Sequence, residues 1–135
     1  MKNLGLAAVP LLALAACDSA PQRTAPDQTI SVRSAEQDAL HQLDSMNLAI
    51  ALKRAIQDGG YVCRRVEKAG FVGQYKNLDM WTASCSGDRA NDWAIFAGPD
   101  GGAQVRDCGD VARFGLPECK ITKEPAVAPA PAKAG

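Results

Sequence analysis

The residues best suited to chemistry in this sequence are a single histidine, His41, and five cysteines. The cysteines are Cys17, Cys63, Cys85, Cys108 and Cys119. A thiol can be acylated, form a disulfide, bind a metal ion or act as a nucleophile, and its sequence context helps to decide which. Zinc sites use closely spaced cysteine pairs, whereas these intervals are wide and no histidine lies near them. The sequence therefore predicts no metal site and no cofactor.

Cys17 follows a segment with the features of an export signal. Lys2 supplies a positive charge, and residues 4–16 form an uncharged apolar run. This run is shorter than the ~20 residues that a helix needs to span a bilayer, but it suits the apolar core of a signal peptide. We therefore expect residues 1–16 to be removed from the mature protein.

The last four residues of this region, Leu14-Ala15-Ala16-Cys17, resemble the lipobox of bacterial lipoproteins. In that family cleavage precedes the cysteine, whose thiol carries a diacylglyceryl group and whose new amino terminus is acylated. The resemblance implies that Cys17 anchors the protein in a membrane, with the folded domain on the periplasmic side of the cell envelope. A conventional signal peptide cut at a small-residue site is the alternative. Asp18 resembles an inner-membrane retention signal, but that sorting rule varies between bacteria, so inner and outer membrane both stay open.

The rest of the chain is predicted to hold one small folded domain between two extended segments. Residues 17–33 contain two prolines and few large apolar groups, as is typical of a tether. Residues 123–135 are rich in alanine and proline, which favours polyproline II and disorder. The folded domain is therefore expected at 34–122. The 15 basic and 15 acidic side chains balance, so no strongly basic face is expected for nucleic acid.

Residues 35–57 are predicted to form one amphipathic helix. Ser34 and Gln37 match a capping box at its start, and the glycine pair at 59–60 ends it. The apolar residues between these signals recur at helical spacing; they include Ala39, Leu43, Met46 and Ile50.

After Gly60 the apolar pattern changes to the alternation of β-strands. An Asp-Gly pair at 100–101 indicates a hairpin between the last two strands, whereas residues 67–77 fit either an extended first hairpin or a loop. The expected fold is α+β, with the N-terminal helix packed on a roughly four-stranded antiparallel meander that disulfides stabilise. The expected strands are 61–66, 80–85, 92–97 and 103–108.

The meander also predicts how the cysteines pair. With Cys17 lipidated, four cysteines remain and allow three pairings. Cys63 is expected opposite Cys85, at a distance that a disulfide can span. A bond from Cys85 to Cys108 would span two strand spacings, about 9.6 Å in total, which is too far for a disulfide. The sequence therefore predicts the disulfides Cys63–Cys85 and Cys108–Cys119.

The other side chains form no motif for catalysis. His41 lies near the edge of the helical apolar stripe and is expected at the surface or the core boundary, because a general base needs a positioned partner and a cleft. Trp81 and Trp93 are expected on one sheet face, either in the core or in an aromatic patch for a partner. Phe114 and Leu116 lie in a short loop that either recognises a partner or caps the core.

The sequence thus predicts a non-catalytic, lipid-anchored envelope protein that binds or supports another component. Its partners would be the membrane, through Cys17, and an envelope protein or the cell wall. The alternative is a periplasmic inhibitor of a hydrolase such as lysozyme, although the sequence contains no inhibitor loop motif.

Overall fold

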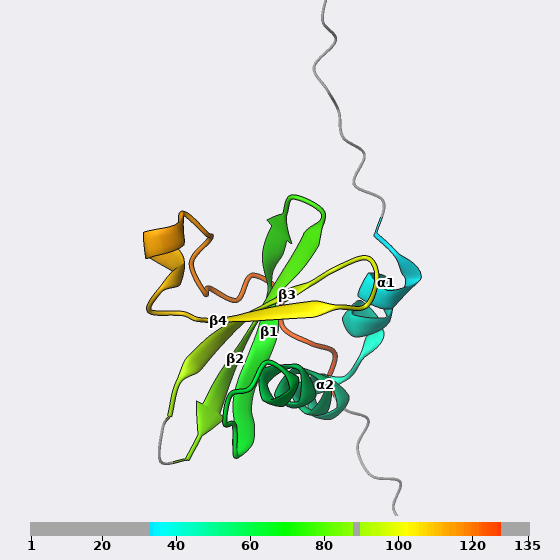
Figure 1. Cartoon of the computed structure of the whole chain (residues 1–135). Coiled ribbons are helices and arrows are strands. Elements are labelled where there is room, and N and C mark those ends of the chain that lie inside the picture. Colours follow the sequence, from blue (N-terminus) through cyan, green and yellow to red (C-terminus); the bar gives the residue numbers. More distant parts are fainter. Residues whose placement is uncertain (1–32, 88–89, 128–135) are drawn as a thin grey trace, which may run out of the picture. The chain divides into compact units, whose positions relative to one another are not determined.

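A computed structural model describes residues 33–87 and 90–127 of the chain. The four strands form one antiparallel sheet in the order β1-β2-β3-β4, in which each strand pairs with its neighbours in sequence (Figure 1). Two helices before this sheet give the α+β class that was predicted. The elements are α1 (Ala35–Gln42), α2 (Ser45–Asp58), β1 (Arg65–Tyr75), β2 (Leu78–Ser86), β3 (Asp92–Ala97), β4 (Ala103–Asp107) and the 3-10 helix η1 (Val111–Phe114).

Several sequence predictions concern residues outside the described part of the chain. These are the signal peptide at 1–16, the lipidated Cys17, the tether as far as residue 32, and the tail from residue 128 onward.

The helical segment consists of two helices, which corrects the single helix predicted over 35–57. Leu43 is extended with ψ of 139°, and Asp44 is extended with ψ of 171°. Asp44 then accepts a hydrogen bond from the backbone N–H of Asn47 at 2.9 Å. Asp is favoured at this N-cap position because its carboxylate satisfies a backbone donor that the first helical turn leaves free. A local cap thus interrupts an apolar pattern that would otherwise continue through it.

Strand β1 begins and ends later than predicted. Residues 61–64 precede it, and the ambiguous segment 67–77 supplies most of it. Strands β1 and β2 meet at a two-residue turn, Lys76-Asn77, in which Lys76 has a positive φ of 57°. By contrast, β3 has the predicted bounds, and β4 is one residue shorter than predicted.

Two irregularities in β1 change which way its side chains point. The pairing with β2 shifts between Val66 and Lys68 and again between Phe71 and Gly73. A β-bulge inserts an extra residue and therefore reverses the face that the following side chains occupy. As a result, Val66 and Ala69 share one face although they are three residues apart, and Tyr75 lies on the opposite face from Phe71 although four residues separate them.

Each face of the sheet carries its own apolar cluster. Helix α2 crosses one face, which we call the helix face (Figure 1). Its buried side chains Leu48, Leu52 and Ile56 are spaced by one turn, so a single stripe of α2 packs on the strands. The sheet residues in this cluster include Trp81, Ala83, Trp93, Ile95 and Val105.

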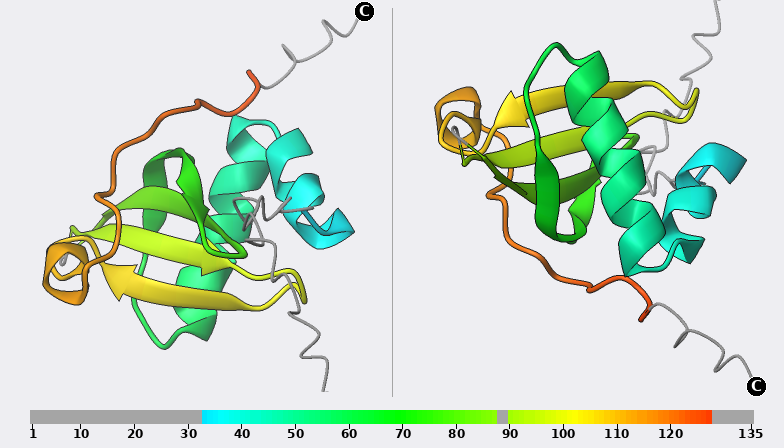
Figure 2. Two further views of the ribbon diagram at one scale, coloured as in Figure 1. Left: turned by 90° about the horizontal axis from the view of Figure 1, so that it is seen from above. Right: turned by 90° about the horizontal axis from the view of Figure 1, so that it is seen from below.

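The opposite face is covered by the chain that follows β4, and we call it the loop face. Figure 2 shows this orange segment running from η1 back across the molecule toward the start of α2. Ile121 packs against Gly70, where an added Cβ would lie 2.5 Å from the Ile121 side chain, so only glycine allows this approach. The buried residues of this cluster are Val72, Met80, Ala94, Phe96 and Val111.

The folded domain extends beyond its predicted limit at residue 122. The backbone N–H of Phe71 donates to the carbonyl oxygen of Lys123 at 3.0 Å, and that of Ser45 donates to Ala126 at 2.9 Å. Residues 123–127 had been expected in the disordered tail. They are instead held by backbone hydrogen bonds to β1 and to the start of α2.

Candidate functional site

Both predicted disulfides are present. Cys63 and Cys85 join across the helix face with a Cα–Cα distance of 5.4 Å, and Cys108 and Cys119 join on the loop face at 5.9 Å. The expected strand register is wrong, however, because Cys85 lies opposite Val66. Cys63 reaches Cys85 from the irregular segment before β1.

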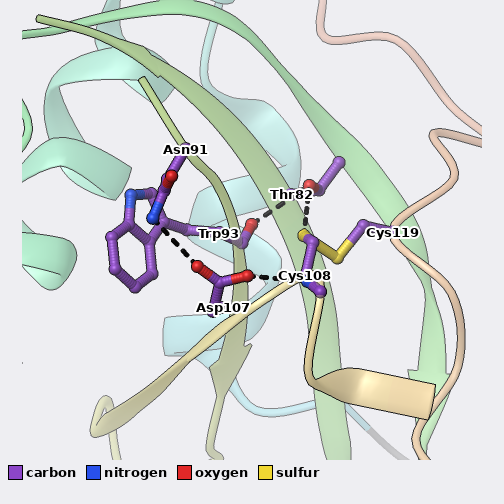
Figure 3. The surroundings of a disulfide bond; sticks show 7 residues. Thr82, Asn91, Trp93, Asp107, Cys108 and Cys119 are labelled. Carbon is purple, nitrogen blue, oxygen red and sulfur yellow. Dashed lines mark hydrogen bonds between the residues drawn. A yellow bond between two sulfur atoms is a disulfide. The ribbon is translucent and has the colours of Figure 1, made fainter. Parts of the chain in front are cut away.

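Figure 3 shows that the second disulfide lies among hydrogen-bonded side chains at the end of β4. The Thr82 hydroxyl donates to the carbonyl oxygen of Trp93 at 3.0 Å. Asn91 donates from its side-chain amide to Asp107 Oδ2 at 2.9 Å. The Asn91–Asp107 bond and the backbone bond from Cys108 N–H to the carbonyl oxygen of Asp92, at 2.9 Å, order the end of β4. The disulfide therefore closes a loop whose first residues are already fixed.

The four residues predicted as a partner surface do not lie together. Trp81 and Trp93 are only 2% and 6% exposed and belong to the helix-face cluster, which agrees with the core role considered for them. Leu116 is partly buried against the loop-face cluster. Phe114 is 61% exposed. Of the four, Phe114 alone has most of its side chain exposed to solvent.

A buried polar cluster, which the sequence did not reveal, joins α1 to the sheet. Asp79 in β2 has no exposed surface, and its Oδ2 lies 2.8 Å from His41 Nε2 and 3.3 Å from Arg33 Nε. The His41 side chain is 10% exposed and that of Arg33 is 39% exposed. A buried carboxylate is tolerated only when hydrogen-bonded or paired, so these two side chains make the position of Asp79 possible.

Aromatic rings hold His41 in place. Its ring centroid lies 4.6 Å from that of Phe71 and 4.8 Å from that of Trp81. The Arg33 guanidinium lies 5.6 Å from the centroid of the same Phe71 ring, within the range of a cation–π contact. His41 therefore sits at the core boundary, as expected, but with a carboxylate partner that was not foreseen.

Gln37 docks the preceding turn of α1. It is buried, and its side-chain amide donates to the carbonyl oxygens of Asn77 at 2.9 Å and Ala97 at 3.1 Å. The same residue completes the predicted capping box with Ser34, through hydrogen bonds of 3.1 and 3.2 Å. Gln37 and His41 are four residues apart and share one helix face. Two polar residues at this spacing were the only local sign that one face of α1 contacts the sheet through polar side chains.

The cluster has part of the arrangement that a general base requires. A histidine oriented by a buried carboxylate resembles the histidine and the acidic residue of a catalytic triad, in which the third member is a nucleophile. His41 and Trp81 line a pocket of about 230 Å³ that Lys123 also borders. No serine, threonine or cysteine is among the described residues that line it. The contact between His41 and Asp79 does, however, attach α1 to β2 of the sheet in one orientation.

A larger groove runs between the helices and the β3–β4 hairpin. Its volume is about 650 Å³, within the range typical of small-ligand sites. Leu40, Leu52 and Ile95 contribute apolar surface to it, whereas Glu36 and Arg54 are charged residues in its lining. Alanines and glycines form much of the remaining wall, and their small side chains leave the groove unfilled.

One surface carboxyl group has a perturbed pKa. The pKa of Glu67 is lowered below its usual value, chiefly because its carboxylate accepts a hydrogen bond from the Arg65 side chain. A hydrogen bond with the Ser86 side chain lowers the pKa further. Arg65 Nη2 lies 2.7 Å from Glu67 Oε1, and both side chains are largely solvated. This pair lies on β1 and contributes to neither of the two pockets above.

Comparisons of the chain with protein-family models, curated proteins and solved structures find no match. Within residues 33–87 and 90–127, none of the helices has the length and apolar character needed to cross a membrane. The same residues contain no group of three or more histidine, cysteine or acidic side chains arranged to hold a metal ion.

Proposed function

We propose that this protein is a lipid-anchored component of the bacterial cell envelope that binds or supports another envelope component without catalysis. The proposal depends chiefly on the lipobox-like sequence at residues 14–17. The two disulfides support it independently, because disulfides persist mainly in oxidising compartments outside the cytosol. Both features lead to the same location.

The proposed anchor would restrict where the domain can act. Each methylene group buried in the bilayer contributes ~0.8 kcal/mol, so the several acyl chains of a lipoprotein hold it firmly. The 16 residues from Asp18 to Arg33 can extend at most about 50 Å, at roughly 3.3 Å per residue. A partner of this domain would therefore lie in a thin layer next to the membrane.

The anchor is tested by Cys17→Ser. We expect this variant to lose metabolic labelling by a radioactive fatty acid and to remain unprocessed. Cys119→Ser serves as the control, because it removes a cysteine that lies outside the lipobox-like sequence and pairs with Cys108, and it should leave the labelling intact. Undiminished labelling of Cys17→Ser would refute the anchor.

The binding role is tested by photo-crosslinking in the envelope. A photoreactive amino acid at Arg54, in the groove, should capture a reproducible envelope protein. The same amino acid at Lys76, in the β1–β2 turn, is the matched control and should not capture it. Failure to capture any partner from the groove would count against binding at this surface.

Inhibition of a hydrolase is the second candidate, and the exposed Phe114 favours it. This side chain projects from the loop that the Cys108–Cys119 disulfide closes. A short loop that is closed by a disulfide loses little conformational entropy on binding. A stoichiometric amount of the protein should then slow clearing of a bacterial suspension by lysozyme, and Phe114→Ala should relieve the effect. An unchanged rate of clearing with the unmodified protein would rule out lysozyme as the target.

A further inference from the structure

The two edges of the sheet differ in how they are covered. At the outer edge of β1, Phe71 exchanges backbone hydrogen bonds with Thr122 and Lys123, so the chain itself occupies that edge. Strand β4 forms the other edge, and among the described residues β3 is the only strand that pairs with it. The described part of the chain therefore protects the β1 edge and leaves the β4 edge open.

The outer edge of β4 presents unused backbone groups. In the hairpin, Gly98 N–H donates to Gly102 O at 2.8 Å, and Cys108 N–H donates to Asp92 O at 2.9 Å. Antiparallel hydrogen bonding alternates along a strand, so the backbone groups of Ala103, Val105 and Asp107 point outward. Of these, the carbonyl oxygen of Asp107 already accepts a hydrogen bond from the N–H of Asp110 at 3.0 Å, and the others lie open to a partner strand. Such an edge is a template for another strand.

Strand β4 is short and carries the charged residues Arg106 and Asp107, but it lacks three other devices that discourage edge pairing. Natural edges are often blocked by lysine, by proline or by a β-bulge. The sequence of β4, Ala-Gln-Val-Arg-Asp, contains neither of these residues. Its pairing with β3 runs without a register shift. The edge is also short, which limits it to a few hydrogen bonds.

An apolar surface lies beside this edge. Phe114 is mostly exposed, and the guanidinium of Arg106 in β4 lies 5.4 Å from its ring centroid. These two side chains, with Gln104 and Leu116, line a hollow of about 190 Å³ on the loop face. A partner strand on β4 would cover part of this surface, and exposed aromatic residues often anchor such contacts.

We propose that the outer edge of β4 pairs antiparallel with β4 of a second copy of this chain, about a two-fold axis at Val105. The two four-stranded sheets would then form one continuous sheet. This axis pairs all five residues of the strand, with Gln104 of one copy facing Arg106 of the other. An axis at Arg106 would instead oppose two like charges, which destabilises a strand pair.

The charge pattern favours a second copy over an unrelated peptide. A two-fold axis repeats every contact, so the favourable Gln104–Arg106 pairing occurs twice in an isologous interface. The inference goes beyond the proposed function and does not require it. With the anchor present, a dimer would carry two lipidated cysteines and so bind the membrane more firmly than one chain.

The experiment uses the full chain as the cell produces it, purified in detergent, and measures its dimerisation constant by sedimentation over a concentration series. Gln104→Glu places two new ion pairs across the axis and should strengthen dimerisation by about two- to thirty-fold. Gln104→Lys places lysine opposite arginine twice and should weaken it by a similar factor. The controls are Gln74→Glu and Gln74→Lys on the opposite edge strand, β1, and these should change nothing.

Each result of this series bears on the proposal. Opposite effects of the two Gln104 substitutions support the Val105 axis. Weakening by both indicates that Gln104 faces its own copy, which overturns the register. No effect from either, or a monomer at every concentration, overturns the β4 interface. Thermal unfolding of each variant, followed by circular dichroism, verifies that the fold is retained.

Discussion

Helices α1 and α2 lie against the same sheet but are held by different kinds of contact. Helix α2 buries three aliphatic side chains, and helix α1 buries one residue fully, the polar Gln37. Apolar burial contributes most of the free energy of folding but has no preferred direction. Hydrogen bonds contribute less but require defined distances and angles. The comparison indicates that the apolar contacts of α2 supply most of the stability. The position and orientation of α1 are set by directional hydrogen bonds.

The largest effect is expected from the apolar contact of α2. Leu52→Ala should lower the free energy of unfolding by about 2–5 kcal/mol, because a cavity remains where a buried leucine packed. Ile50→Ala, at an exposed position on the same helix, is the control and should cost no more than about 0.5 kcal/mol. Urea denaturation followed by tryptophan fluorescence measures both. Equal losses of stability in the two variants would contradict the conclusion that the buried side chains of α2 stabilise the fold.

The next effect concerns the carboxylate that holds α1. Asp79→Ala leaves His41 buried without its acceptor and should cost about 1–3 kcal/mol. Asp79→Asn keeps an acceptor oxygen and should cost less. Hydrogen exchange should show faster opening of α1 than of α2 in Asp79→Ala. Uniform acceleration across both helices would mean that the cluster supports the whole fold and not α1 in particular.

A smaller loss is expected at Gln37. Replacing it with alanine removes two donors to buried carbonyl groups and the capping interaction at Ser34, at a cost of about 1–2 kcal/mol. Gln42→Ala, at the exposed end of the same helix, should be nearly neutral. Chemical denaturation measures both variants. If the two substitutions prove equally mild, polar docking does not distinguish α1 from α2.

The smallest effect concerns the junction between the helices. Asp44→Ala removes the N-cap of α2 and should cost about 1 kcal/mol, with fraying confined to the first turn. The control, Asp58→Ala, removes an acidic side chain at the other end of α2, where the helix dipole disfavours negative charge. It should therefore be neutral or slightly stabilising. Far-ultraviolet circular dichroism during thermal unfolding compares the two, and equal losses would contradict the capping argument.

The outcome at α1 shows where sequence reasoning stops. The capping box at Ser34 and Gln37 was predictable, because its partners are three residues apart. The break at Asp44 had a local signal as well, but the apolar stripe outweighed it. The contact between His41 and Asp79 had none, since these residues lie 38 positions apart. It depends on where β2 falls once the sheet has formed.

The sheet shows the same division. The Asp-Gly hairpin and the bounds of β3 follow from alternation and turn chemistry over a few residues. Strand β1 was misplaced, because its bulges disturb the alternation from which strands are recognised. The disulfide pairing was still predicted, since few pairings suit a meander even when the register is off by several residues.

The sequence by itself determined the class of fold, the capped start of α1, the hairpin before β4 and the two disulfides. These features depend on interactions between near neighbours, or on the small number of ways to pair four cysteines. Only the tertiary structure decided that Arg33 and His41 meet on Asp79, that the tryptophans are buried, and that residues 122 and 123 cover β1, whereas within residues 33–87 and 90–127 only β3 pairs with β4. These depend on strand register and chain path, because distant residues meet only after the sheet has packed.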